Sequence, residues 1–285
     1  MMLFKSVVSV VAWLVIGFSS CTVYNFSDPA GPQFVGSHAV QKAAGQSGQI
    51  KIVSYNIAWG KHIDEAVNEM AVLPELRGAD ILLLQEMNIH GVKEIAERAG
   101  YNYLYYPGSI HPYNHSDIGN AILSAWPISE SKKLILPHKQ SWNDRIRTAT
   151  VATITIHDIP IRIYNVHTAT VMMSEAKRAD QLLAVVADVN PNGERVIVGG
   201  DFNTVWRSSV QHSMNLFRAH GFVCASDTAG ATVEALGLFP LCLDHFFVKG
   251  LQVISCGVEE DANASDHFPV WVVLDYKSDE SFAAR

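Results

Sequence analysis

Cysteine is scarce in this chain. Its 285 residues include only four cysteines, and no two of them form a Cys-x-x-Cys pair, so a zinc site built from thiolates is not expected. Apart from Cys21, the cysteines are Cys224, Cys242 and Cys256. Three is an odd number and permits at most one internal disulfide. Free buried thiols and a single bridge are both compatible with the sequence.

Positive charge is limited as well. Lys and Arg together number 21 against 28 Asp and Glu, which gives a net charge of -7. Because the binding of long duplexes depends on Lys and Arg contacts to phosphates, this balance argues against a broad basic surface for nucleic acid. It does not exclude a nuclease, because a metal ion at the scissile phosphate would supply positive charge locally.

Internal repeats and low-complexity segments are absent from the sequence. The hydrophobic content of 48% is enough to bury one large core, and α/β sandwiches of this size commonly form one domain. We therefore expect one main domain over residues 49–276, followed by a short tail at 277–285.

The first 21 residues have the pattern of a targeting segment. Lys5 precedes an apolar run from Val7 to Phe18, which is short for a membrane span and is followed by Ser19-Ser20-Cys21. This order resembles a bacterial lipoprotein signal, in which cleavage leaves Cys21 lipidated. Phe18 replaces the usual Leu, so an ordinary signal peptide or an uncleaved anchor is the alternative.

Residues 22–48 are expected to form a flexible tether, because they carry Pro29, Pro32 and several Gly and Ser without apolar periodicity. Thr22 rather than Asp follows the cysteine, which in enterobacterial sorting favours the outer membrane. The expected location is therefore the bacterial cell envelope, as an exported outer-membrane lipoprotein facing the periplasm or the exterior.

Apolar runs of two periodicities alternate along the rest of the chain. Helical spacing predicts helices at 63–76, 91–99 and 174–189. Short apolar runs predict strands at 50–53, 81–84, 101–106, 119–124, 147–156, 161–166, 195–199, 244–248 and 270–274. This order indicates two mixed sheets packed face to face with helices outside.

Five of the predicted strands adjoin polar residues of catalytic type. The clusters are Ser54-Tyr55-Asn56, Gln85-Glu86, Asn165-Val166-His167, Gly199-Gly200-Asp201-Phe202-Asn203 and Ser265-Asp266-His267-Phe268-Pro269. Acids, amides and imidazoles at strand ends are where an α/β sandwich places a metal and a hydrolytic water.

As a set, and in their order along the chain, these motifs resemble the endonuclease/exonuclease/phosphatase superfamily, whose fold is DNase I-like. The segment Gly119 to Ser124 fits the same family. The resemblance covers roughly residues 49–276 and implies a four-layer α/β sandwich, two packed mixed β-sheets flanked by helices. It also implies a metal-dependent hydrolase of phosphoric esters, most simply a phosphodiesterase or nuclease-type enzyme.

Two alternatives to that activity stay open. One is a phosphatase or phospholipase C-like enzyme that acts on inositol phosphate or sphingomyelin-type headgroups. The other is a catalytically silent sandwich that binds phosphate or a protein. The family's acid, amide and imidazole positions are all filled with competent residues, which favours an enzyme.

The resemblance implies a metal site at Glu86, Asn56 and Asp266. Oxygen ligands of this kind suit Mg²⁺, for which Mn²⁺ can substitute. Taken alone, Glu86 could equally be a strand-end carboxylate that faces solvent.

Two further residues are assigned to the attacking water and its orientation. The resemblance makes Asp201 the group that positions or deprotonates the water, and Asn203 the amide that orients the water or the phosphate. An Asp-x-Asn turn is otherwise common as a motif that caps the backbone.

The resemblance assigns two histidines to the phosphate. His267 is expected to contact a phosphate oxygen or the attacking water, with the Asp244 carboxylate fixing its tautomer. In an extended segment, the adjacent side chains of Asp266 and His267 should diverge. His167 is expected to donate to a non-bridging oxygen or to assist the leaving group.

Two positions depart from the abasic-site nucleases of this family. Ala58 stands where they carry an acid, and Asp117 stands where they carry an aromatic residue, which argues against abasic-site activity. A hydrophobic hairpin for membrane insertion would indicate a sphingomyelinase, but none is found between the core strands; the nearest candidate, Phe239-Pro240-Leu241, is short. The expected partners are a phosphate ester, from nucleic acid, a lipid headgroup or a small molecule, and a membrane through the lipid anchor. The protein is expected to be a monomer.

Overall fold

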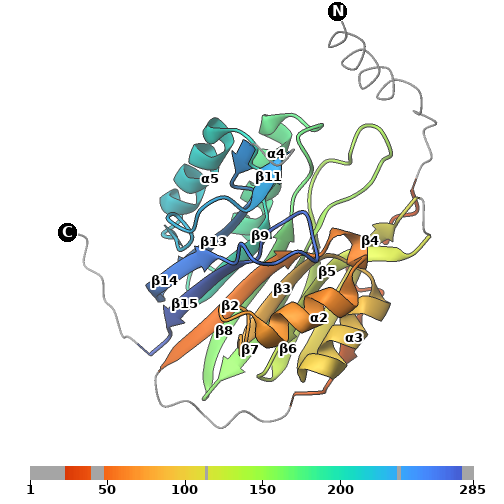
Figure 1. Ribbon diagram of the computed structural model, residues 1–285. Helices are drawn as coiled ribbons and strands as arrows, with labels where there is room; N and C mark the ends of the chain where they lie inside the picture. Colours follow the sequence, from red (N-terminus) through yellow and green to blue (C-terminus); the bar gives the residue numbers. More distant parts are fainter. Residues whose placement is uncertain (1–22, 40–47, 113–114, 236–238, 278–285) are drawn as a thin grey trace, which may run out of the picture.

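The computed structural model describes residues 23–39, 48–112, 115–235 and 239–277. Two β-sheets pack face to face in this part of the chain, and helices cover their outer faces (Figure 1). The sandwich of two mixed sheets predicted from the sequence is confirmed.

The first sheet contains seven strands. In spatial order they are β1 (Phe34–Gly36), β4 (Asn102–Ile110), β5 (Asp117–Ser124), β3 (Ile81–Met87), β2 (Gln49–Asn56), β15 (Val270–Asp275) and β14 (Gln252–Val258). Only β2 and β3 run parallel; the other neighbours are antiparallel. The helices α2 (Ile63–Val72) and α3 (Ile89–Ala99) and the short 3₁₀ helix η1 (Ala58–Gly60) follow β2 and β3.

The second sheet contains six strands. In spatial order they are β10 (Val223–Cys224), β13 (Asp244–Lys249), β9 (Val196–Asp201), β8 (Ile159–His167), β7 (Thr148–Ile156) and β6 (Ile128–Ile135). The helices α4 (Glu175–Asp188) and α5 (Arg207–Ala219) lie on its outer side, and a separate hairpin is formed by β11 (Val233–Ala235) and β12 (Phe239–Leu241).

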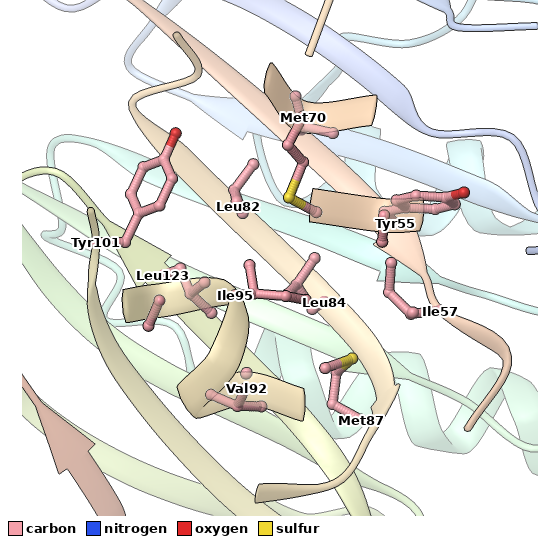
Figure 2. Close-up of a cluster of buried hydrophobic side chains, with 14 of the residues drawn as sticks. Tyr55, Ile57, Met70, Leu82, Leu84, Met87, Val92, Ile95, Tyr101 and Leu123 are labelled. Atoms are coloured by element: carbon pink, nitrogen blue, oxygen red, sulfur yellow. The ribbon is translucent and has the colours of Figure 1, made fainter. Parts of the chain in front are cut away.

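The central strands explain why four layers form. In β3, Ile81 and Leu83 belong to the cluster between the two sheets, whereas Leu82 and Leu84 belong to the cluster beneath α2 and α3. Successive side chains of a strand point to opposite faces, so an unbroken apolar run needs cover on both. Figure 2 shows the outer cluster, in which Leu82 and Leu84 lie among residues of α2 and α3 such as Met70 and Ile95.

Helix α5 and strand β14 are absent from the sequence prediction. In α5 the residues Val210, Met214 and Phe217 follow helical spacing, but two of the three fully buried positions are Ser209 and Ser213, so the apolar stripe is narrow. In β14 the side chains are exposed or half-buried, because this strand is the edge of the first sheet. Apolar periodicity is therefore weak in both elements.

The predicted tether differs from the structure over residues 23–39. Val23 is buried, Asn25 bridges to Ser109, and β1 pairs with β4 and forms the edge of the first sheet. The ammonium group of Lys133 donates to the carbonyls of Phe26 and Gly31 at 2.7 and 2.6 Å. The segment thus covers an open sheet edge, a task that needs backbone groups rather than apolar side chains.

Three cysteines are described, and all three, Cys224, Cys242 and Cys256, are free. Cys21 and the tail 278–285 lie outside the described residues. None of the helices in the described ranges is long and apolar enough to cross a membrane.

Candidate active site

Strand register brings the predicted polar clusters to one edge of the sandwich. His167 at the end of β8 lies opposite Asp201 at the end of the parallel strand β9. Strand β13 is antiparallel to β9 and places its first residue, Asp244, opposite the same Asp201. In the first sheet, Val270 pairs with Ser54, so the cluster before β15 lies near the end of β2. Motifs far apart in sequence therefore meet.

Asp201 lies at the centre of this group, and its two carboxylate oxygens have different partners. Oδ1 accepts a hydrogen bond from the backbone N–H of Asn203 at 2.8 Å. Oδ2 accepts one from Nδ2 of Asn56 at 3.1 Å and lies 3.4 Å from Nε2 of His167 and 4.0 Å from Nε2 of His267. Oδ1 thus takes part in the capping turn, and Oδ2 faces the predicted site residues.

Gly200 allows this arrangement. Its φ is +136°, and a Cβ atom built there would lie 1.9 Å from the carbonyl oxygen of Val166. Only glycine lets β9 approach β8 so closely immediately before Asp201.

Asp244 and His267 form a buried pair. Oδ2 of Asp244 lies 2.8 Å from Nδ1 of His267, within hydrogen-bond distance as expected from the sequence. Burial opposes protonation of the imidazole, but the carboxylates of Asp244, Asp201 and Asp266 outweigh it and raise the pKa of His267 to about 10. The ring is therefore an imidazolium at neutral pH.

The surroundings also shift the pKa values of Asp201 and His167. Burial raises the pKa of Asp201 to about 7, with a further contribution from the negative charge of Asp244. Burial and the positive charges of Arg147 and Arg145 hold the pKa of His167 well below its ordinary value. His167 is therefore neutral, whereas His267 is charged.

Glu86 lies in an irregular part of β3. The register with β5 shifts between Leu84 and Met87, and Glu86 has a left-handed φ of 55°. Its side chain is 17% exposed, with Oε1 3.9 Å from Nε2 of His167, and no hydrogen bond from the described residues reaches the carboxylate. Burial raises the pKa of Glu86, and the nearby Arg147 opposes that rise. Backbone strain of this kind accumulates at functional sites.

Two predicted residues are turned partly away from the cluster. The side-chain amide of Asn203 donates to the carbonyl of Thr168 at 3.2 Å. Asp266 is exposed and accepts a hydrogen bond from Ser265, while the adjacent His267 faces Asp244, so the two neighbours diverge as expected.

Asp117, a departure from the abasic-site nucleases, accepts from the phenol of Tyr105 at 2.6 Å and from the backbone N–H of Ile89 at the start of α3.

Two arginines belong to the site and were not predicted. Nη1 of Arg147 lies 2.9 Å from Nε2 of His167, and Nε of Arg145 donates to Ser109 at 2.9 Å. Burial lowers the pKa of both guanidinium groups, that of Arg147 to about 10. One sequence signal could have revealed them. Arg145 and Arg147 directly precede β7, the strand that pairs with β8 and so with His167.

The donor set fits a hard divalent cation. Glu86 is a desolvated carboxylate without a hydrogen-bonding partner among the described residues, and Oδ1 of Asp244 is buried and unpaired in the same part of the chain. Ligand atoms of Asp201, Asp244 and His267 also lie within 4.8 Å of one another, but an imidazolium at His267 has no lone pair to offer a cation. Asn56 can offer Oδ1, although that oxygen also accepts the backbone N–H of Ala58 at 3.1 Å. Oxygen-rich sites of this type suit Mg²⁺ or Mn²⁺.

A family model matches the segment that contains this geometry. The model of the Endonuclease/Exonuclease/phosphatase family matches residues 53–267, which include every site residue discussed above. The chain belongs to this family. It is therefore a hydrolase of phosphoester type.

Individual relatives agree with the family assignment. The chain is 28% identical over 207 residues to the uncharacterized protein YbhP of Escherichia coli K12, a match that covers 62% of this chain and 78% of that protein. A solved family protein from Bacteroides thetaiotaomicron has a TM-score of 0.64 at 19% identity, covering 79% of this chain and 97% of that one.

Two further solved structures show the same fold. A D. rerio TDP2 humanized by 14 mutations has a TM-score of 0.63 at 16% identity and covers 80% of this chain and 99% of that one. A mannosyl-6-phosphatase of Bacteroides thetaiotaomicron has a TM-score of 0.61 at 20% identity and covers 79% and 99%.

Proposed function

We propose that this protein is a divalent-metal-dependent phosphodiesterase that uses Mg²⁺, for which Mn²⁺ can substitute. The observation that carries the proposal is the buried group around Oδ2 of Asp201, which unites His167, His267 and Asn56 with the Asp244 carboxylate. The charged imidazole of His267 and the neutral imidazole of His167 are thereby held beside Oδ2 of Asp201, the carboxylate that can act as the base.

Asp201 is the base for the attacking water. Its pKa of about 7 is close to the pH at which the reaction runs, which is the condition for efficient proton transfer. Oδ1 is held by the backbone of Asn203, so Oδ2 receives the proton of the water.

The charged imidazole of His267 binds the phosphoryl group. Its Nδ1–H donates to Asp244, which leaves Nε2–H for a non-bridging oxygen. Nη1–H of Arg147 donates to Nε2 of the neutral His167 ring, so Nδ1 carries the ring proton and is the atom that donates to a second oxygen or to the leaving group. Arg147 also contributes positive charge. The amide of Asn203 orients the water or the phosphate.

The metal is assigned to Glu86, Asn56 and Asp266. When bound, it would neutralise charge on the phosphoryl oxygens and on the leaving oxygen. A raised pKa on a strained, desolvated Glu86 is consistent with a carboxylate placed to receive a cation.

The charged groups of the site are the carboxylates of Glu86, Asp201, Asp244 and Asp266 and the cations of Arg145, Arg147 and His267. Because the two signs are nearly balanced, charge does not choose between a diester and a monoester, and the comparison of the two substrates below makes that choice. Among the structural neighbours, a D. rerio TDP2 is complexed with a single-strand DNA product and another protein is a mannosyl-6-phosphatase. They support phosphoester chemistry without selecting among nucleic acid, headgroup and small molecule.

The test is hydrolysis of bis(p-nitrophenyl) phosphate and p-nitrophenyl phosphate by the purified full chain. We expect Mg²⁺ or Mn²⁺ to support turnover of the diester and EDTA to abolish it. Glu86→Gln should raise the metal concentration that gives half of the maximal rate. The control Glu97→Gln changes an exposed carboxylate of α3 and should behave as wild type. Full activity after exhaustive chelation would refute the metal assignment. No hydrolysis of any phosphoester would favour the silent sandwich.

We also propose that the chain is exported and lipidated at Cys21. The support is the basic, apolar and small-residue order that precedes this cysteine. The lipid would hold the enzyme at the envelope membrane.

A further inference from the structure

Three loops at the catalytic edge of the second sheet carry exposed apolar side chains. Val171 and Met172, which follow His167, are 45% and 63% exposed. Trp206, which follows Asn203, is 63% exposed, and Phe239, which precedes Asp244, is 59% exposed. These four residues are called the apolar rim below.

The first loop presents its apolar residues at the corners of a turn. The N–H of Met173 donates to the carbonyl of Thr170 at 2.9 Å, so Val171 and Met172 occupy the two central positions. Those positions usually carry Gly, Pro, Asn or Asp. The guanidinium group of the buried Arg178 donates to the carbonyls of Thr170 and Met173, which fixes the turn from below.

The second loop places tryptophan where a polar residue is usual. Trp206 is the N-cap residue of α5 and makes no side-chain hydrogen bond to the helix. Ser, Thr, Asp or Asn at this position typically stabilises a helix by about 1 kcal/mol relative to an apolar residue. An exposed indole at this position lacks that stabilisation, and burial of the ring does not replace it.

The third element is the hairpin of β11 and β12, which is rooted at the catalytic pair. The hydroxyl of Thr232 accepts hydrogen bonds from the backbone N–H groups of Leu243 and Asp244 at 3.0 and 3.2 Å. The carbonyl of Thr232 accepts the N–H of Phe268, the residue after His267. The hairpin therefore stands directly beside the active site.

Hydrogen bonds between the loops keep the apolar rim together. The hydroxyl of Thr168 donates to the carbonyl of Phe202, and the N–H of Phe202 donates to the carbonyl of Leu243. Thr204 donates to the carbonyl of Cys242 at 2.7 Å. The rim residues lie within four positions of these contacts along the chain, so the three loops that carry them are joined at their bases.

The N-terminal part of the chain reaches the same edge. Asn25 bridges to Ser109, which in turn accepts a hydrogen bond from Arg145, a neighbour of the site. The N–H of Val23 donates to the carbonyl of Asn143 in the adjacent loop. In Figure 1 the start of the described chain, β11 and α4 all lie in the upper part of the molecule. The apolar sequence from Val7 to Phe18 precedes this point.

We propose that the apolar rim inserts into the interfacial region of a phospholipid bilayer and that the substrate is a phosphodiester of an amphiphile presented at that surface. The substrate part of this inference rests on the proposed phosphodiesterase activity. Tryptophan is favoured at bilayer interfaces because its ring is apolar with one polar end. The net charge of -7 argues against attraction to anionic lipid, so a zwitterionic surface is the partner.

The test is co-sedimentation of the full-length protein with dioleoylphosphatidylcholine vesicles. We expect Met172→Ser, Trp206→Ser and Phe239→Ser each to lower the partition coefficient about three- to tenfold, the range for one large apolar side chain. The control Val223→Ser removes an apolar residue of 60% exposure at the opposite end of β13 and should bind as wild type. All variants are prepared with the same N-terminal segment as the wild type, so lipid binding by that segment is common to all of them.

A second measurement locates Trp206 itself. Vesicles that contain brominated phosphatidylcholine should quench part of the tryptophan emission of the wild type, and Trp206→Phe should lose most of that quenched component. Equal binding by the rim and control variants, together with unchanged quenching in Trp206→Phe, would overturn the proposal. So would dimers that the rim variants abolish in a protein that does not bind vesicles, since the rim would then cover a second copy.

The outcomes for the rim and for the enzyme are separable. Rim-dependent vesicle binding without hydrolysis of any phosphoester would refute the proposed function and leave the lipid surface standing. Hydrolysis of bis(p-nitrophenyl) phosphate together with equal vesicle binding by the rim and control variants would refute the lipid surface and leave the enzyme.

Discussion

Oδ2 of Asp244 lies 2.8 Å from Nδ1 of His267, although 23 positions separate the two residues in the chain. Both are buried, and the second oxygen of Asp244 has no hydrogen-bonding partner among the described residues. The pair is therefore held by the fold rather than by local sequence, and it controls the charge beside Asp201.

The pair should act as one unit in catalysis. Asp244→Asn keeps the shape but removes the charge that favours the imidazolium, so turnover should fall about 10²- to 10⁴-fold with folding intact. His267→Ala should cost at least as much, and the double variant little more than His267→Ala alone. Steady-state kinetics of the four proteins measures this. Multiplicative losses would show that Asp244 only caps its strand.

The pH dependence should follow the same pair. Asp201 must be ionised to accept a proton, so kcat/KM should rise as the pH passes about 7. His267 must be protonated, so kcat/KM should fall as the pH passes about 10. In Asp244→Asn both limbs should move to lower pH, because the lost negative charge had raised both pKa values. A pH profile of this variant that superimposes on that of the wild type would contradict the assignment.

Arg147 should be required for the phosphoryl-binding side of the site. Arg147→Gln removes the positive charge beside His167 and should lower kcat/KM about 10²-fold, since charge-assisted donors at a phosphoryl group are typically worth this much. Arg147→Lys should recover part of the loss. Arg162→Gln is the matched control, because Arg162 pairs opposite Val196 at the other end of β8. Equal effects of the two glutamine variants would argue for a general loss of stability instead.

Gly200 should be irreplaceable for packing. Gly200→Ala places a Cβ atom 1.9 Å from a backbone oxygen and should lower the free energy of unfolding by roughly 3 kcal/mol or more. Gly78→Ala also forces a left-handed conformation on alanine but meets nothing within 4 Å, so it should cost only about 1 kcal/mol. Urea denaturation of both variants checks the difference. Similar costs would show that φ alone, and not the contact with Val166, fixes Gly200.

Cys21→Ser should change processing and location. The variant should appear in a soluble fraction or remain unprocessed, because serine lacks the sulfur atom to which the lipid would be attached. Fractionation and intact mass of the wild type and the variant measure this. Unchanged mass and unchanged membrane partitioning would assign retention to another feature.

The sequence predicts the catalytic strands well because each is a continuous apolar run that ends in a chemically distinctive residue. Asn56, His167 and Asp201 are examples, and strand register then brings them together. Arg145 and Arg147 escape such reasoning, since isolated arginines usually face solvent and only the fold shows that these two are buried.

Polar contacts account for the other differences. The packing of residues 23–39 depends on backbone pairing and on Lys133, neither of which leaves an apolar pattern. The hairpin of β11 and β12 has strands of three residues, too short for an alternating pattern to be read. Strain at Glu86 is likewise a property of the bulge in β3 and not of the residue.

The attachment of residues 23–39 also limits how far the enzyme could move on a lipid anchor. Val23 is fixed to the loop that contains Asn143, so an anchor at Cys21 would stand at most two residues away from the packed part of the chain. Two extended residues span about 7 Å at most. A lipidated protein of this design would not sample the space around the membrane as a tethered enzyme does. It would remain at the headgroup level, and its substrates would have to come to it by diffusion within the bilayer plane.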